Sequence, residues 1–142
     1  MQLSKNFTLA ELCVTTTGLA NVPNQAEIQR LRLLATKCLQ PLRDSLGRAL
    51  VVNSAFRSEK VNAAVGGSGT SDHRTGQAAD VWTDGMTSLT LAKHVITHKI
   101  PFDQLIYYPG TRRVHVSYRE GGNRGQVMTA HSNGRYTAGL PK

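Results

Sequence analysis

Two short segments, residues 78–82 (AADVW) and 114–118 (VHVSY), restrict the fold more than any other part of the chain. Side chains of a β-strand alternate between its two faces, so each segment presents apolar residues on one face. Those residues are Ala79, Val81, Val114 and Val116. The opposite face carries one residue of a type that binds metals, Asp80 in the first segment and His115 in the second. We therefore predict two strands of a sheet with one buried face.

Helical periodicity dominates the N-terminal part of the chain. Thr8 and Glu11 have the spacing of a capping box, which predicts a short helix after Thr8. Residues 21–47 repeat apolar side chains at helical spacing and predict a long helix. Pro41 should bend or break that helix, and Gly47 is a suitable terminator.

The remaining segments alternate between strand and helix signals. Residues 49–57 form a β-branched run that predicts a strand, and residues 59–71 predict a helical turn followed by a glycine-rich loop. Residues 88–99 predict a helix, and residues 102–118 predict a hairpin that turns at a Pro-Gly pair. Residues 120–142 are glycine-rich and weakly patterned. This order predicts an α+β fold, a small antiparallel sheet with helices packed on it.

Length and charge limit the organisation and the partners. A chain of 142 residues without internal repeats or a linker is expected to form one domain, residues 1–142, and we expect a monomer. The net charge of +8 favours electrostatic attraction to an anionic cell envelope. The basic residues are scattered and lack interleaved aromatic residues, so no specific nucleic-acid partner is expected. No signal peptide is recognisable, which predicts synthesis in the cytoplasm.

A metal site can be assembled from these strands. If residues 78–82 and 114–118 are neighbours, Asp80 and His115 can meet, and a turn at Gly76 can bring His73 over the same point. Two imidazoles and one carboxylate suit zinc, which leaves its fourth position for water in catalytic sites. The alternative is a surface histidine and an ordinary strand aspartate, and spacing alone leaves both readings open.

The motif around these residues resembles a known family. Residues 71–80, SDHRTGQAAD, resemble the S-x-H-x-x-G-x-A-x-D signature of the M15 zinc peptidases, which include D-alanyl-D-alanine carboxypeptidases and phage endolysins. The segments LSKNFTLAEL, QPLRDSLG, VVNSAFRS, VNAAVGGSGTS and the hairpin FDQLIYY…VHVSY resemble further family elements in the same order. The resemblance covers roughly residues 3–118. It implies the fold of D-Ala-D-Ala peptidases, related to hedgehog domains, and a bound Zn²⁺.

The resemblance also implies roles for individual residues. His73, Asp80 and His115 would be the zinc ligands, and Arg57 would be an active-site arginine that stabilises an oxyanion or holds a substrate carboxylate. Without the resemblance, Arg57 would be read as a surface arginine in a salt bridge. Ser71 would orient His73 or contact substrate, or it would simply cap its own turn.

The chain departs from the family at the general base. Related enzymes place a carboxylate three residues before the last histidine or at the end of the preceding strand. Here those places hold Arg112 and the pair Tyr107-Tyr108, and we expect Tyr108 to occupy the location of the base. A tyrosine is a poor base near neutral pH unless its pKa is depressed.

The function that the resemblance implies is hydrolysis of stem-peptide bonds in peptidoglycan. The absence of a signal peptide suits a bacteriophage endolysin that stays in the host cytoplasm until lysis and then acts on the cell wall. The missing carboxylate keeps an alternative open, a non-catalytic peptidoglycan-binding module on the same fold.

Overall fold

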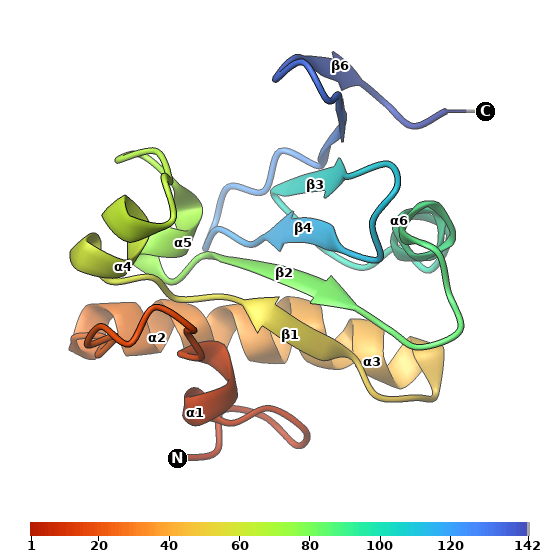
Figure 1. Cartoon of the computed structure of the whole chain (residues 1–142). Coiled ribbons are helices and arrows are strands. Elements are labelled where there is room, and N and C mark those ends of the chain that lie inside the picture. The colour runs from red at the N-terminus through yellow and green to blue at the C-terminus, as the bar shows by residue number, and fades with distance from the viewer. Residues whose placement is uncertain (142) are drawn as a thin grey trace.

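The computed structural model describes residues 1–141, which form a six-stranded sheet and seven helical segments. The strands lie in the order β1-β2-β4-β3-β5-β6 (Figure 1). Their bounds are β1 Val51–Ser54, β2 Ala78–Trp82, β3 Gln104–Tyr107, β4 Val114–Ser117, β5 Gln126–Ala130 and β6 Tyr136–Ala138. The helices are α1 Leu9–Leu12, α2 Gln25–Leu34, the π-helical η1 Ala35–Leu39, α3 Gln40–Leu46, α4 Glu59–Ala64, α5 Asp72–Thr75 and α6 Ser88–Thr97. The predicted α+β class is confirmed.

The two strands that constrained the fold are direct neighbours in the middle of the sheet. β2 pairs antiparallel with β4 in a register that places Asp80 opposite His115. The apolar residues of both strands are fully buried; they are Ala79, Val81, Val114 and Val116. The predicted hairpin is also present, because β3 pairs antiparallel with β4 and places Ile106 opposite His115. The alternation in the sequence therefore predicted the buried face, and the structure supplies the pairing that the metal site required.

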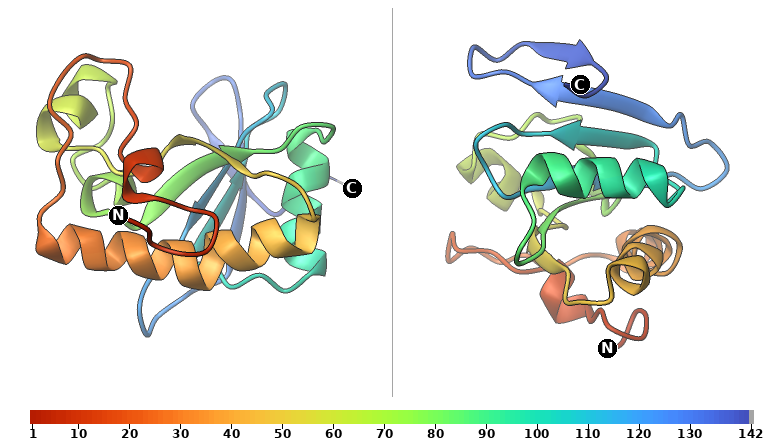
Figure 2. Two further views of the ribbon diagram at one scale, coloured as in Figure 1. Left: turned by 90° about the horizontal axis from the view of Figure 1, so that it is seen from below. Right: turned by 90° about the vertical axis from the view of Figure 1, so that its right-hand side faces the viewer.

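One long helix covers the apolar face of the sheet. α2, η1 and α3 follow one another without a break (Figure 2, left), and their buried side chains join the same hydrophobic core as Val81 and Val114. Of the two outcomes predicted for Pro41, a bend or a break, the break does not occur, because α3 continues through it. The backbone N–H of Gln40 bonds to the carbonyl of Ala35, five residues back. This π-helical turn directly precedes Pro41 and allows the helix to continue past a residue that has no backbone N–H. Gly47 ends the helix with a left-handed backbone, as predicted.

Two further helices complete the core. α1 begins at Thr8 with the predicted capping box, in which Thr8 and Glu11 bond to each other's backbone N–H groups. α6 packs beside β3 and β4 through its buried residues Leu91, Ala92 and Val95. None of the helices within residues 1–141 is both long and apolar enough to cross a membrane.

The C-terminal region contributes two strands that the sequence did not predict. β5 pairs with β3 in parallel, and β6 pairs antiparallel with β5 at the edge of the sheet. All other pairings are antiparallel. Every residue of β6 is exposed, so no buried face imposed an apolar alternation on its sequence. The sheet is consequently larger than expected and contains one parallel pair.

Candidate metal centre

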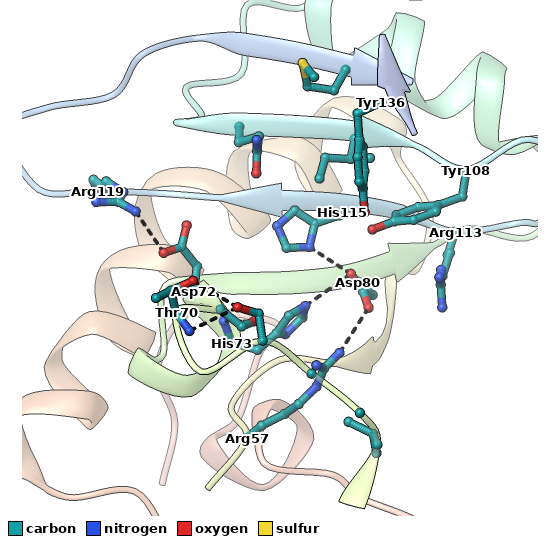
Figure 3. A pocket seen from close by; sticks show the side chains of 18 of the residues that line it. Arg57, Thr70, Asp72, His73, Asp80, Tyr108, Arg113, His115, Arg119 and Tyr136 are labelled. Atoms are coloured by element: carbon teal, nitrogen blue, oxygen red, sulfur yellow. Dashed lines mark hydrogen bonds and ion pairs between the residues drawn. The ribbon is translucent and has the colours of Figure 1, made fainter. Parts of the chain in front are cut away.

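His73, Asp80 and His115 converge on one point, and we refer to them as the metal-site group (Figure 3). His115 Nδ1 lies 3.1 Å from Asp80 Oδ1, and His73 Nε2 lies 3.3 Å from the same oxygen. One ligand-type atom from each residue lies within 4.8 Å of the other two. All three residues are buried, with 3%, 6% and 8% of their surface exposed. The structure thus brings together the three residues that the sequence singled out.

The metal-site group lies in a cleft of about 800 Å³. One side of the cleft is formed by the glycine-rich loop 65–71, and the floor includes β-strand residues such as Ile106. Three further lining residues come from the unpredicted C-terminal region: Arg124, Met128 and Tyr136. No periodic pattern marked these residues in the sequence, because only their place in the sheet brings them to the cleft.

Short-range interactions give α5 the shape that presents His73. The Ser71 hydroxyl accepts a hydrogen bond of 3.2 Å from the His73 backbone N–H, so Ser71 is the N-cap of this helix. Gly76 ends the helix with φ of +82°, a conformation that favours glycine. A Cβ atom on Gly76 would lie 2.8 Å from the Glu27 carbonyl oxygen of α2. Ser71 therefore caps the short helix that carries His73, as one of the predicted readings stated, and Gly76 permits close packing of α5 on α2.

Polar contacts attach α5 to the long helix. Arg30 Nε donates a 2.6 Å hydrogen bond to the Thr75 carbonyl. Arg74 Nη1 lies 2.6 Å from Glu27 Oε2, and the Glu27 side chain is buried. A charge-assisted hydrogen bond of this kind is stronger where water is excluded. The position of His73 is thereby tied to the core of the protein.

The tautomer of His73 is set by the backbone next to β1. His73 Nδ1 lies 2.7 Å from the Ala55 carbonyl oxygen, and a carbonyl can only accept, so Nδ1 carries the proton and donates it. The other ring nitrogen, Nε2, then presents its lone pair toward Asp80 when the imidazole is neutral. Outer hydrogen bonds of this kind orient histidine ligands in metal sites. His115 offers Nδ1 instead.

The Asp80 carboxylate is strongly stabilised in its ionised form. Burial acts to raise its pKa, but a hydrogen bond from His115 and, when its Nε2 is also protonated, one from His73, together with the charges of these rings, outweigh burial and hold the pKa well below its ordinary value. An ionised carboxylate with two imidazole nitrogens is a donor set that zinc accepts. The residues present therefore fit a divalent zinc ion.

Arg57 borders the metal-site group. Its Nη2 lies 3.8 Å from Asp80 Oδ2, its Nε lies 3.2 Å from the Ser54 hydroxyl, and its Nη1 lies 3.4 Å from Asn62 Oδ1. These contacts hold the guanidinium at the wall of the cleft beside Asp80 (Figure 3). Arg57 is thus at the site rather than in a remote surface salt bridge.

Tyr108 lines the same cleft as the metal-site group (Figure 3), and its role at the location of the base stays a prediction. Burial, followed by the charge of Asp80, raises the pKa of the Tyr108 hydroxyl to about 12. The hydroxyl is therefore protonated near neutral pH and can donate a hydrogen bond but cannot accept a proton. Among residues 1–141, the carboxylates that line the cleft are Asp72 and Asp80, and Asp72 is bonded to Arg119 at 2.9 Å.

Comparisons with known proteins agree with this geometry. A family profile described as Peptidase M15 matches residues 5–117. The zinc D-Ala-D-Ala carboxypeptidase of Streptomyces albus G is 32% identical over 134 residues, which is 91% of this chain and 50% of that protein. The chain thus spans about half the length of this relative. The match over most of its length, together with the converging His73, Asp80 and His115, shows that the chain belongs to the M15 peptidase family.

Proposed function

We propose that this protein is a zinc metallopeptidase that hydrolyses peptide bonds in the stem peptides of peptidoglycan. The observation that carries the proposal is the buried metal-site group at the floor of a cleft in a member of the M15 family. The name of the Streptomyces albus G relative, a zinc D-Ala-D-Ala carboxypeptidase, supports both the metal and the substrate class.

The residues around the metal-site group suit a hydrolytic reaction. A zinc ion bound to His73, Asp80 and His115 would supply Lewis-acid polarisation of a carbonyl and lower the pKa of water to about 7. Arg57 places a fixed positive charge at the cleft wall, where it can stabilise a developing oxyanion. Tyr108 can donate its hydroxyl proton in a hydrogen bond to the same oxygen or to the leaving group.

The biological role that we propose is that of a bacteriophage endolysin. In this role the enzyme would be made in the host cytoplasm and would act on the cell wall after its release at lysis. A net charge of +8 would attract the enzyme to an anionic envelope after release. The test of this role is lysis of cells from within, upon expression with and without a membrane-permeabilising partner.

The enzymatic proposal is tested by mass spectrometry of purified muropeptides after digestion, with zinc quantified in the same protein sample. We expect new peptide termini and about one zinc per chain. His73→Ala should abolish both, whereas His98→Ala should change neither, because His98 is exposed at the C-terminal cap of α6 and does not line the cleft. Intact stem peptides with fully zinc-loaded protein would contradict the proposal.

A second candidate function is a non-catalytic peptidoglycan-binding module. It is favoured by one observation, the pairing of both cleft carboxylates with arginine or histidine side chains within the described residues. This candidate predicts tight binding to muropeptides without new termini. The same mass-spectrometric experiment separates the two functions.

A further inference from the structure

Arginine side chains dominate the charge of the cleft. The arginines that line it are Arg57, Arg113, Arg119 and Arg124. The last two share the fully buried carboxylate of Asp103: Arg119 Nε lies 3.1 Å and Arg124 Nη2 lies 2.8 Å from its Oδ2. Arg119 also bonds to Asp72, and Arg57 faces Asp80. Three of the four positive charges are therefore balanced by carboxylates.

Arg113 differs from the other three. Within residues 1–141 its guanidinium has no ion-pair partner, and its Nε is the one buried side-chain nitrogen or oxygen that lacks a hydrogen bond. The guanidinium carbon lies 4.3 Å from the centre of the Tyr108 ring, which fixes its orientation by stacking. A partly buried charge without a counter-charge is unfavourable. The cleft thus holds one positive charge that the protein does not balance.

The position of Arg113 directs this charge toward a bound peptide. Arg113 precedes His115 by two residues, stacks on Tyr108 and lines the same cleft as Asp80 (Figure 3). Arg57 is held by three contacts to Ser54, Asn62 and the metal-site group, which leaves it less free to bind an anion. A guanidinium presents paired N–H donors that match the two oxygens of a carboxylate.

We infer that Arg113 binds a carboxylate of the peptide substrate and so determines which peptides this protein accepts. This inference rests on the proposed function and deepens it, because it names a recognised group of the substrate. Stem peptides offer carboxylates of two origins, the free C-terminus and the α-carboxylate of a γ-linked glutamate. Both have the same chemistry, so the test must distinguish them.

The neighbouring residue supplies a matched control. Arg112 lies in the same turn, but its guanidinium carbon stacks 3.7 Å from the Trp82 ring centre and its Nη2 lies 3.6 Å from Asp84. Its side chain is 59% exposed and does not line the cleft. Arg112→Gln therefore removes the same charge from the same turn without touching the site.

The experiment uses two pairs of synthetic stem peptides. One pair differs only in a C-terminal acid or amide, and the other only in γ-linked glutamate or its α-amide. We expect Arg113→Gln to lower kcat/KM for the carboxylate member of one pair by roughly 10- to 100-fold and to leave its amide member unchanged. Arg113→Lys should retain part of the preference, and Arg112→Gln should retain all of it. The peptide pair in which Arg113→Gln lowers kcat/KM for the acid shows which of the two carboxylates Arg113 binds.

A binding measurement separates this inference from the proposed function. Dissociation constants of the same peptides are measured by calorimetry with His73→Ala, alone and combined with Arg113→Gln. If Arg113→Gln removes a carboxylate preference in binding, while the wild-type protein with bound zinc cleaves none of the peptides, the proposed function alone is overturned. If the wild type cleaves the peptides but Arg113→Gln changes kcat/KM equally for acids and amides, or not at all, the inference alone is overturned. Neither cleavage nor a preference in binding would overturn both.

Discussion

Replacement of Gly76 by alanine tests whether packing of α5 on the long helix positions the metal-site group. Gly76 has φ of +82°, and an added Cβ would lie 2.8 Å from the Glu27 carbonyl oxygen and 3.2 Å from Leu31 Cγ. Gly47 is a matched control, because it also ends a helix with a left-handed backbone, φ of +65°. A Cβ on Gly47 would meet no atom within 4 Å. The two substitutions thus share the backbone strain and differ in the steric clash.

The structure sets the expected magnitudes. A left-handed backbone costs an alanine about 1–2 kcal/mol at either position. At Gly76 the new methyl group also presses against the backbone of α2, which cannot rotate away as a side chain could, and overpacking of this kind costs about 1–3 kcal/mol. The expected difference in unfolding free energy between the two variants is large enough to measure, because a typical domain is stable by only about 5–15 kcal/mol.

The assay is urea unfolding of the metal-free wild type and both variants, followed by zinc affinity from competition with a chelating dye. We expect Gly76→Ala to be less stable than Gly47→Ala by about 1–3 kcal/mol. Because Gly76 caps the short helix that carries His73, three residues after it, zinc affinity should fall by roughly 10- to 100-fold in Gly76→Ala. Gly47→Ala should bind zinc like the wild type.

Equal losses of stability in the two variants would refute the steric reasoning, because only backbone strain would then matter. An unchanged zinc affinity in a destabilised Gly76→Ala protein would refute the second step, that contact between α5 and α2 determines the position of His73. The two measurements therefore test separate links of the same argument.

Three further predictions follow from the charges of the site. Tyr108→Phe should lower kcat by roughly 100-fold without changing the shape of the pH–rate profile near neutrality, since the hydroxyl with its pKa of about 12 does not titrate there. Hydrogen bonds from Arg124 lower the pKa of Asp103 in the folded protein. The ionised Asp103 therefore stabilises the fold fully above the carboxyl pKa of the unfolded chain, about 4, and this stabilisation is lost as the pH falls through the lower pKa of the folded state. Urea unfolding should accordingly show a smaller acid-induced loss of stability in Asp103→Asn than in the wild type. Zinc at about 100 times its dissociation constant should stabilise the wild type by about 2.7 kcal/mol in thermal unfolding, and Asp80→Asn should remove most of this gain.

The sequence predicted the centre of the fold better than its edge. Strands with one buried face must alternate, and that alternation correctly separated Asp80 and His115 from the apolar residues of their strands, so that pairing of the strands brings the two together. β6 has no buried residue, and β5 is held next to β3 partly through Asp103, whose carbonyl accepts from the backbone N–H of Gln126. Single tertiary contacts of this kind leave no periodic trace in a sequence. The same reason explains why Tyr136 could not be predicted in the cleft.

The division of the site between central and peripheral elements has a consequence for specificity. Asp80 and His115 lie on strands with neighbours on both sides, where a change of backbone position would disturb the whole sheet. Arg113 and Tyr136 lie in a turn and in an edge strand, where side chains can change with little effect on the core. The family match ends at residue 117, so Tyr136 lies outside the part of the chain that it covers. Substrate preference in this protein should therefore depend on these peripheral residues, while its metal chemistry depends on the central strands.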